Sequence, residues 1–208
     1  MHQNLFGGSI TEFCFVKNHS LVLLLRLFSS VQLCVCVNHI VRYDFPGKWT
    51  QIVDKISIYL QSPDPSGLMG ALLSLYQLVK NFEYKEAEER APLTEAMNLL
   101  LPQIQQLLVR LLPDLSEQSV LLQKQILKIF YALTQYSLPL ALLPKPTFTQ
   151  WMELVRAIAD RPVPEQTLTV DEDERPKLSW WKCRKWAMHI LVLVFERYGS
   201  PGEFRSTL

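Results

Sequence analysis

Apolar residues recur along this chain in a spacing that covers one face of a helix. In the segment 68–79 they occupy positions i, i+4, i+7, i+8 and i+11. The same spacing returns twice later in the chain and, in part, once before. The four sets are Leu33, Val37, Ile40 and Val41; Leu68, Leu72, Leu75, Tyr76 and Val79; Leu122, Ile126, Ile129, Phe130 and Leu133; and Ala187, Leu191, Val194, Phe195 and Tyr198. We predict four equivalent helices, with the pairs Leu75/Tyr76, Ile129/Phe130 and Val194/Phe195 buried at equivalent places between repeats.

Helices of a second kind are predicted between these four. Each has apolar residues along one side, and prolines or glycines mark most boundaries. They are Trp49–Gln61, Pro92–Leu112 and Thr147–Asp160. One helix pair cannot bury its apolar faces alone, so neighbouring pairs have to stack.

The alternation therefore predicts an all-α fold, an α-solenoid of HEAT-like helix pairs. The predicted units are pairs at about 31–62, 66–112 and 116–160, followed by a final helix at 178–198. A closed helical bundle is the competing architecture, but it would have one central core and no series of equivalent interfaces.

Composition supports a globular helical protein and excludes some partners. Of the 208 residues, 49% are hydrophobic and 20% are charged, which is unlike a disordered chain. The formal net charge is +1, so no global field attracts nucleic acid or an anionic membrane. We expect no direct binding of nucleic acid.

The four cysteines do not form a metal-binding or disulfide pattern. Cys34 and Cys36 make a C-x-C pair, but no second pair or histidine doublet completes a tetrahedral site with them, and Cys14 and Cys183 stand apart. We expect buried thiols, no metal or cofactor, and a reducing compartment such as the cytoplasm or nucleus.

The most apolar window, Leu21–Val37, is predicted to be a buried helix and not a membrane span. Arg26, Ser29, Ser30 and Gln32 interrupt it, and a central arginine costs roughly 2.5–3.5 kcal/mol on insertion. Its uninterrupted apolar part is far shorter than the ~20 residues that span a bilayer. A small helical protein associated with a membrane through this window remains the alternative.

One acidic run is the candidate binding site. It consists of Asp171, Glu172, Asp173 and Glu174 in a loop closed by Pro176. Such a run attracts a basic partner, although a solvated linker has the same composition. No calcium-binding loop motif accompanies it.

The tryptophans after the acidic run are predicted to enter the core. Trp180, Trp181 and Trp186 flank Lys182, Arg184 and Lys185, but helical geometry does not gather the basic and aromatic groups into one groove. The four histidines lie in unrelated contexts, and no nucleophile, phosphate-loop or zinc-protease motif occurs. We expect no enzymatic activity and no catalytic residues.

Several long stretches resemble one protein family. They are "DFPGKWTQIVDKISIYLQS", "LYQLVKNFEYKEAEERAPL", "SVLLQKQILKIFYAL" and "VDEDERPKLSWWKCRKWAMHILVLVFERYGSPG". These resemble the importin seven/eight type of nuclear import receptor, in the importin-β superfamily, which is built of tandem HEAT repeats. The resemblance covers about residues 31–204, whereas Met1–Ser30 do not match and 205–208 form a tail.

The resemblance implies a receptor that carries basic cargo proteins, such as ribosomal proteins and histones, past the nuclear pore proteins. The GTPase Ran, in its GTP form, releases the cargo inside the nucleus. It also implies a location in cytoplasm, nucleus and nuclear envelope, and it places Trp49–Gln61, Pro92–Leu112 and Thr147–Asp160 as the inward, ligand-facing helices. Asp171–Glu174 would then emerge beside the concave surface and meet lysine-rich cargo or a basic patch on Ran.

The resemblance further implies that the matched stretch is an early-middle portion of a longer solenoid, since the repeats that form the main Ran-binding part of the family are not matched ahead of Val31. A HEAT-repeat scaffold without any link to Ran is the alternative function.

Overall fold

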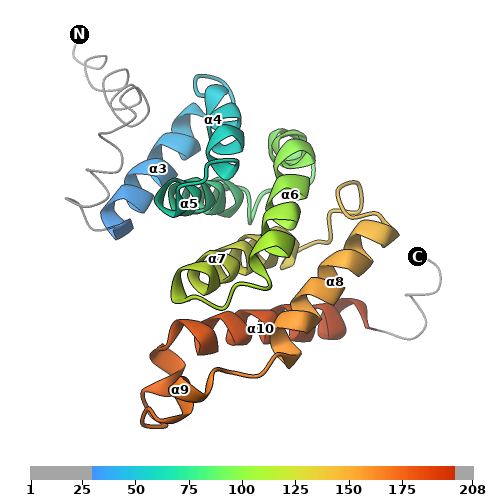
Figure 1. The fold of residues 1–208 in the computed structure, drawn as a ribbon. Helices are drawn as coiled ribbons and strands as arrows, with labels where there is room; N and C mark the ends of the chain where they lie inside the picture. The colour runs from blue at the N-terminus through green and yellow to red at the C-terminus, as the bar shows by residue number, and fades with distance from the viewer. Residues whose placement is uncertain (1–29, 200–208) are drawn as a thin grey trace.

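The computed structural model describes residues 30–199, and this part of the chain is built from helices without a strand (Figure 1). The longer helices are α3 (Ser30–Asp44), α4 (Gln51–Leu60), α5 (Pro65–Asn81), α6 (Ala91–Leu111), α7 (Glu117–Thr134), α8 (Lys145–Asp160) and α10 (Ser179–Tyr198). A short helix α9 (Glu165–Leu168) and a 3-10 turn η1 (Arg175–Lys177) lie between α8 and α10. The predictions for residues 1–29 and 205–208 lie outside the described residues.

Local capping explains where two of the central helices begin. The Asp64 carboxylate accepts hydrogen bonds from the backbone N–H groups of Ser66 (3.1 Å) and Gly67 (2.9 Å), and Pro65 follows at the first helical position of α5. The Ser116 hydroxyl accepts from the backbone N–H of Ser119 (3.3 Å) at the start of α7. These caps satisfy backbone donors that have no partner within the helix.

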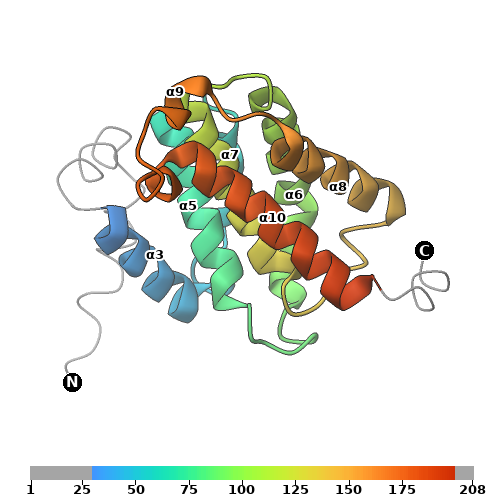
Figure 2. The same ribbon diagram turned by 90° about the horizontal axis from the view of Figure 1, so that it is seen from below.

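The helices form two layers that run in one direction along the chain. In one layer α3, α5, α7 and α10 pack side by side in sequence order, and in the other α4, α6 and α8 follow one another (Figure 1). Between the layers, α4 packs mainly on α5 and α8 mainly on α10, whereas α6 lies against both α4 and α7. Figure 2 shows α10 lying across α7 at the end of this stack.

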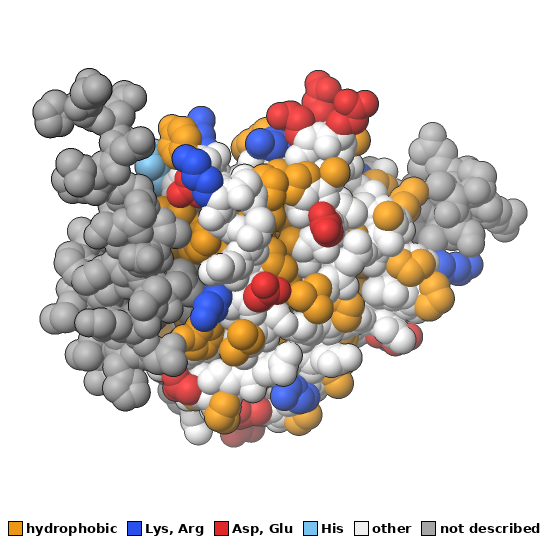
Figure 3. All heavy atoms as spheres, turned by 90° about the horizontal axis from the view of Figure 1, so that it is seen from above, with side chains coloured by type: hydrophobic (Ala, Val, Ile, Leu, Met, Phe, Trp, Pro, Cys, Tyr) orange, Lys and Arg blue, Asp and Glu red, His pale blue; other side chains and the backbone are white. Residues whose placement is uncertain are grey.

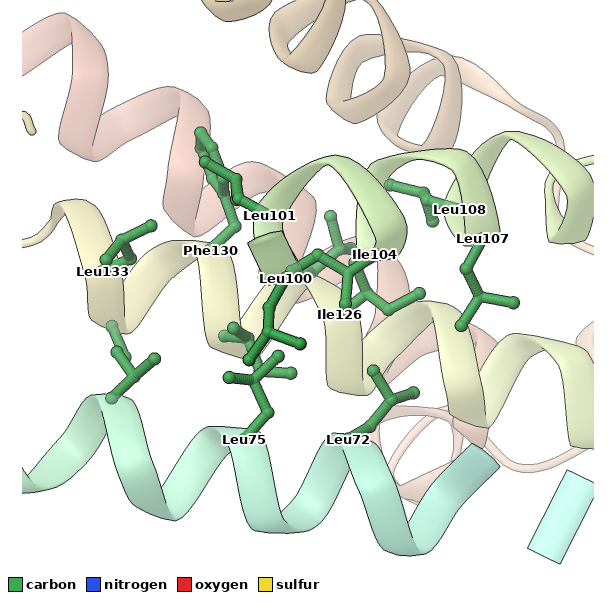
Figure 4. Packing of buried hydrophobic residues seen from close by; sticks show 14 of the residues in the cluster. Leu72, Leu75, Leu100, Leu101, Ile104, Leu107, Leu108, Ile126, Phe130 and Leu133 are labelled. Atoms are coloured by element: carbon green, nitrogen blue, oxygen red, sulfur yellow. The ribbon is translucent and has the colours of Figure 1, made fainter. Parts of the chain in front are cut away.

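A continuous hydrophobic core lies between the layers. It extends from Val37 on α3 to Ile190 on α10 without a break. In its centre the leucines of α5 and α6 interdigitate with Ile126 and Phe130 of α7 (Figure 4). The Phe130 ring stacks on Trp151 of α8, with ring centroids 4.3 Å apart. Because this core runs from one helix pair to the next and has no single centre, it confirms the predicted α-solenoid and excludes a closed bundle.

The predicted helix stripes are buried in the middle of the stack and exposed at its end. Leu75, Ile129 and Phe130 are fully buried, and Tyr76 is half-buried. The prediction is wrong for the last pair, because Val194 is only half-buried and the Phe195 side chain is 76% exposed. The reason is that α10 is the last helix of the described stack, so no further described helix covers its outward stripe.

The structure also corrects the implied inward helices. Neighbouring helices of the α3, α5, α7 and α10 layer pack along much of their lengths, whereas α6 and α8 splay apart. The gap is a groove of ≈ 560 Å³ between Pro102, Val109 and Leu154. Helices of a curved stack are closest on its concave side, so α3, α5, α7 and α10 form the inner layer. The predicted inward segments Trp49–Gln61, Pro92–Leu112 and Thr147–Asp160 contain α4, α6 and α8, which form the outer layer.

The outer layer has a mixed surface. Figure 3 looks onto the side of α4 and α6, where hydrophobic side chains are scattered among polar and charged ones. Within residues 30–199 no helix is long and apolar enough to cross a membrane. The window Leu21–Val37 lies partly outside the described residues, and its described part belongs to α3.

Candidate functional site: the acidic loop

The predicted acidic site lies in the connection from the outer layer to the inner layer. After α8 ends at Asp160, the chain forms α9 and η1 and then enters α10. Figure 2 shows this connection at one rim of the stack, beside the start of α10. The Thr167 hydroxyl, which is largely buried, donates to the Pro164 carbonyl (2.8 Å) and so fixes the turn at α9.

The four carboxylates are all exposed, but they are not equivalent. Arg175 donates to Glu172 (3.4 Å), and Lys177 donates to Glu174 (2.6 Å). The backbone N–H of Asp173 donates to the Asp171 carboxylate (3.0 Å). Neither aspartate has a basic partner within residues 30–199, so the loop keeps an excess of negative charge at two adjacent points.

Arg175 gives the loop its shape. Its Nε donates to the Val170 carbonyl and one terminal nitrogen to the Leu168 carbonyl, both at 2.9 Å. The guanidinium therefore ties the acidic turn to the end of α9. Arg175 and Lys177 offset two of the four negative charges, so residues 171–177 keep a net charge of −2.

The base of the loop is held in the core by Arg161. Its guanidinium donates to the Gln123 side chain (2.9 Å), lies over the Trp180 ring at 4.6 Å from the ring centroid, and reaches the Cys183 sulfur at 3.8 Å. Burial lowers the pKa of Arg161 and raises the pKa of the Cys183 thiol to about 11.

The tryptophans are packing residues, as predicted. Trp180 is buried, and Trp181 and Trp186 are half-buried against the core. No group of three or more histidine, cysteine or acidic side chains within the described residues is arranged to hold a metal ion.

A second acidic loop, residues 82–90 between α5 and α6, provides a useful contrast. Glu83 there is buried and pairs with Lys80 and the Gln135 side chain, which joins α5 to α7. Burial alone would lower the pKa of Lys80, but the hydrogen bond and charge of Glu83 outweigh it and leave that pKa raised. Glu86, Glu88 and Glu89 in the same loop are exposed.

The arrangement of the helices defines a class of protein. Paired helices stacked in two layers, with a charged loop at the rim, form the architecture of helical-repeat proteins that bind other proteins.

Sequence similarity to known proteins shows which family this chain belongs to. The chain is 62% identical to Importin-8 of mouse over 173 residues, which is 83% of this chain and 17% of that protein. It is 31% identical to an importin beta-like SAD2 homolog of Arabidopsis thaliana over 191 residues, covering 89% of this chain and 18% of the relative. A probable importin-7 homolog of Dictyostelium discoideum is 27% identical over 199 residues, with 93% and 18% covered.

The chain thus spans less than a fifth of the length of these relatives. No protein-family model and no solved structure matches it. The chain belongs to the importin-β superfamily, and within it to the importin-7/8 type.

Proposed function

We propose that this chain is a segment of a nuclear transport receptor that binds basic cargo proteins and, in the intact receptor, responds to Ran in its GTP form. The observation that supports this most strongly is the 62% identity to Importin-8 over 83% of the chain. In this proposal residues 31–204 are the receptor solenoid, 1–30 a distinct N-terminal segment, and 205–208 a tail. The receptor moves between cytoplasm and nucleus past the pore proteins of the nuclear envelope.

The acidic loop is the proposed contact for basic partners. Asp171 and Asp173 are exposed without a basic partner in the described chain, and Glu172 and Glu174 are held only in solvent-exposed pairs. Exposed pairs of this kind contribute little energy and exchange readily for a ligand's lysine. Such a loop mainly raises the association rate and the sensitivity to salt.

Function as a binding protein, without enzymatic activity or direct contact with nucleic acid, follows from the same proposal. Cargo is recognised by charge and shape, and no covalent chemistry is required of any residue in the solenoid.

A lysine-rich decapeptide with a fluorescent label tests the proposal, with the whole chain titrated at several salt concentrations. For this chain we expect binding that weakens with salt. For the intact receptor we expect release of the peptide by Ran loaded with a GTP analogue but not by Ran with GDP. Equal behaviour with the two forms of Ran would favour the alternative, a HEAT-repeat scaffold without Ran.

The loop's part is tested by the variant D171N/E172Q/D173N/E174Q. The matched control is E86Q/E88Q/E89Q, which neutralises the exposed carboxylates of the other acidic loop. We expect only the first variant to weaken peptide binding at low salt, by about tenfold. If both bind like the unaltered chain, the acidic loop is a solvated linker.

A further inference from the structure

The inner layer carries a surplus of positive charge that the outer layer lacks. The helices α3, α5, α7 and α10 contain eight lysines and arginines but only three acidic residues. These three, Asp44, Glu117 and Glu196, all lie in the first or last turn of their helices. The outer helices α4, α6 and α8 contain four basic and four acidic residues. The central part of the inner layer is therefore basic, although the whole chain has a net charge of only +1.

Lys128 is the centre of this surface. It lies on α7, and its ammonium is 4.5 Å from the centroid of the Tyr76 ring on α5 and 5.7 Å from that of the Trp186 ring on α10. One lysine thus links three successive inner helices through two aromatic rings. Tyr131 and His189 extend the aromatic group, because the Trp186 ring lies 5.3 Å from the first and 5.5 Å from the second.

A second lysine lies one helical turn away on the same face of α7. Lys124 is half-buried like Lys128, and Lys182 on α10 is close enough to act on it electrostatically. No acidic side chain within residues 30–199 pairs with Lys124 or Lys128. Burial first, and then the repulsion of neighbouring lysines, lowers the pKa of both groups.

Half-buried ammonium groups without carboxylates are costly for the isolated fold, because they are partly desolvated and repel one another. A ligand with closely spaced negative charges offsets both costs, because its carboxylates pair with the ammonium groups and reduce their mutual repulsion. We propose that the inner-layer surface around Lys124, Lys128 and Lys182, with Tyr76 and Trp186, binds an extended Asp/Glu-rich segment of a partner protein. In an extended chain alternate side chains are about 6.6 Å apart, which is similar to the rise of about 6.0 Å along α7 from Lys124 to Lys128.

An acidic polypeptide fits this surface better than a single-stranded nucleic acid. Base recognition on such platforms needs free aromatic faces for stacking. Here the Lys128 ammonium lies over the Tyr76 and Trp186 rings, and the Tyr131 and Trp186 rings meet edge to face at 71°.

This surface is distinct from the acidic loop, so its test is independent of the proposed function. The probe is a fluorescently labelled octapeptide of alternating Glu and Asp, titrated with the whole chain at low salt. A peptide of alternating Gln and Asn and a twelve-residue oligo-dT serve as comparison probes. We expect binding of the acidic peptide alone, weakening as salt is added.

The variant K124Q/K128Q should weaken binding of the acidic peptide at least about tenfold. The outer-layer control K55Q/K145Q removes the same charge from α4 and α8. It should change the affinity for the acidic peptide by less than about twofold. K124R/K128R keeps the charge and should bind within about threefold of the unaltered chain, which separates lost charge from lost folding.

Three results would overturn the proposal. The acidic peptide could fail to bind the unaltered chain, the two glutamine variants could weaken it equally, or oligo-dT could bind more tightly than the peptide. The last result would make the inner layer a nucleic-acid surface.

Discussion

The acidic loop and the inner-layer lysines carry opposite charges and are built in opposite ways. The loop's carboxylates come from four consecutive residues, are exposed, and lie beside their own basic residues. The inner surface is assembled from Tyr76, Lys128 and Trp186 on three different helices, and its two lysines on α7, Lys124 and Lys128, are half-buried. The loop therefore needs only its own turn, whereas the inner surface exists only while the helices are stacked.

The largest effect is expected where the stack itself is disrupted. Phe130 is fully buried and stacks on Trp151, so F130A should lower the free energy of unfolding by about 3–5 kcal/mol. Phe195 occupies the equivalent position on α10 but is 76% exposed. F195A should therefore change the free energy of unfolding by less than about 0.5 kcal/mol. Urea unfolding followed by circular dichroism measures both. Equal losses would show that the described end of the stack is covered in solution.

A pH-dependent effect is expected where the loop joins the core. Burial raises the pKa of Cys183 to about 11 from an ordinary value of 9.0, so the unfolded chain loses this proton first as the pH rises. Stability from this group is complete below pH 9 and is lost between pH 9 and about 11. Between pH 9 and about 11, the free energy of unfolding of the unaltered chain should fall by about 2 kcal/mol more than that of C183A. Parallel pH profiles in denaturant titrations would contradict the burial of this thiol.

A smaller effect is expected for the ring that meets Lys128. Trp186 is half-buried, so W186A should cost about 1–2 kcal/mol of unfolding free energy, less than a fully buried tryptophan. A double-mutant cycle with K128M should show coupling of about 0.5–1 kcal/mol from the cation–π contact. Additive losses in the cycle would mean that the two side chains do not interact.

The smallest effect on stability is expected in the loop. The variant D171N/E172Q/D173N/E174Q removes only exposed carboxylates and exposed ion pairs, so the free energy of unfolding should change by less than about 0.5 kcal/mol. Thermal melting alongside the E86Q/E88Q/E89Q control checks this. A loss above 2 kcal/mol would show that the loop is an integral part of the fold.

Much of the fold could be predicted because a helical stripe is a local pattern. The spacing of Leu122, Ile126 and Phe130 is visible in the sequence, and these side chains are buried as predicted. The apolar spacing shows that a helix requires a neighbour, but not whether that neighbour is present. This is why the prediction that Phe195 is buried is wrong. The resemblance, and not the periodicity, implied which helices face inward, and the spacing of apolar residues could not correct it because it does not define the direction of curvature.

The two charged regions differ in the same way. Asp171–Glu174 is a run of four consecutive acidic residues, so it can be recognised from the sequence alone. Lys128 can be recognised as part of a binding surface only from its contacts with Tyr76 and Trp186, which are far from it in the chain. One local signal was present: Lys124 and Lys128 share a face of α7, and α7 has no acidic residue after Glu117.

One crossed titration tests the central claim, that the solenoid carries two binding surfaces of opposite charge. A lysine-rich peptide and a Glu/Asp peptide are each titrated against the loop variant D171N/E172Q/D173N/E174Q and the inner-layer variant K124Q/K128Q, at one low salt concentration. The account predicts that the loop variant loses only the basic peptide and the inner-layer variant only the acidic one, each by about tenfold. Equal changes for both peptides in either variant would contradict it, because the charges would then act as one field and not as two surfaces.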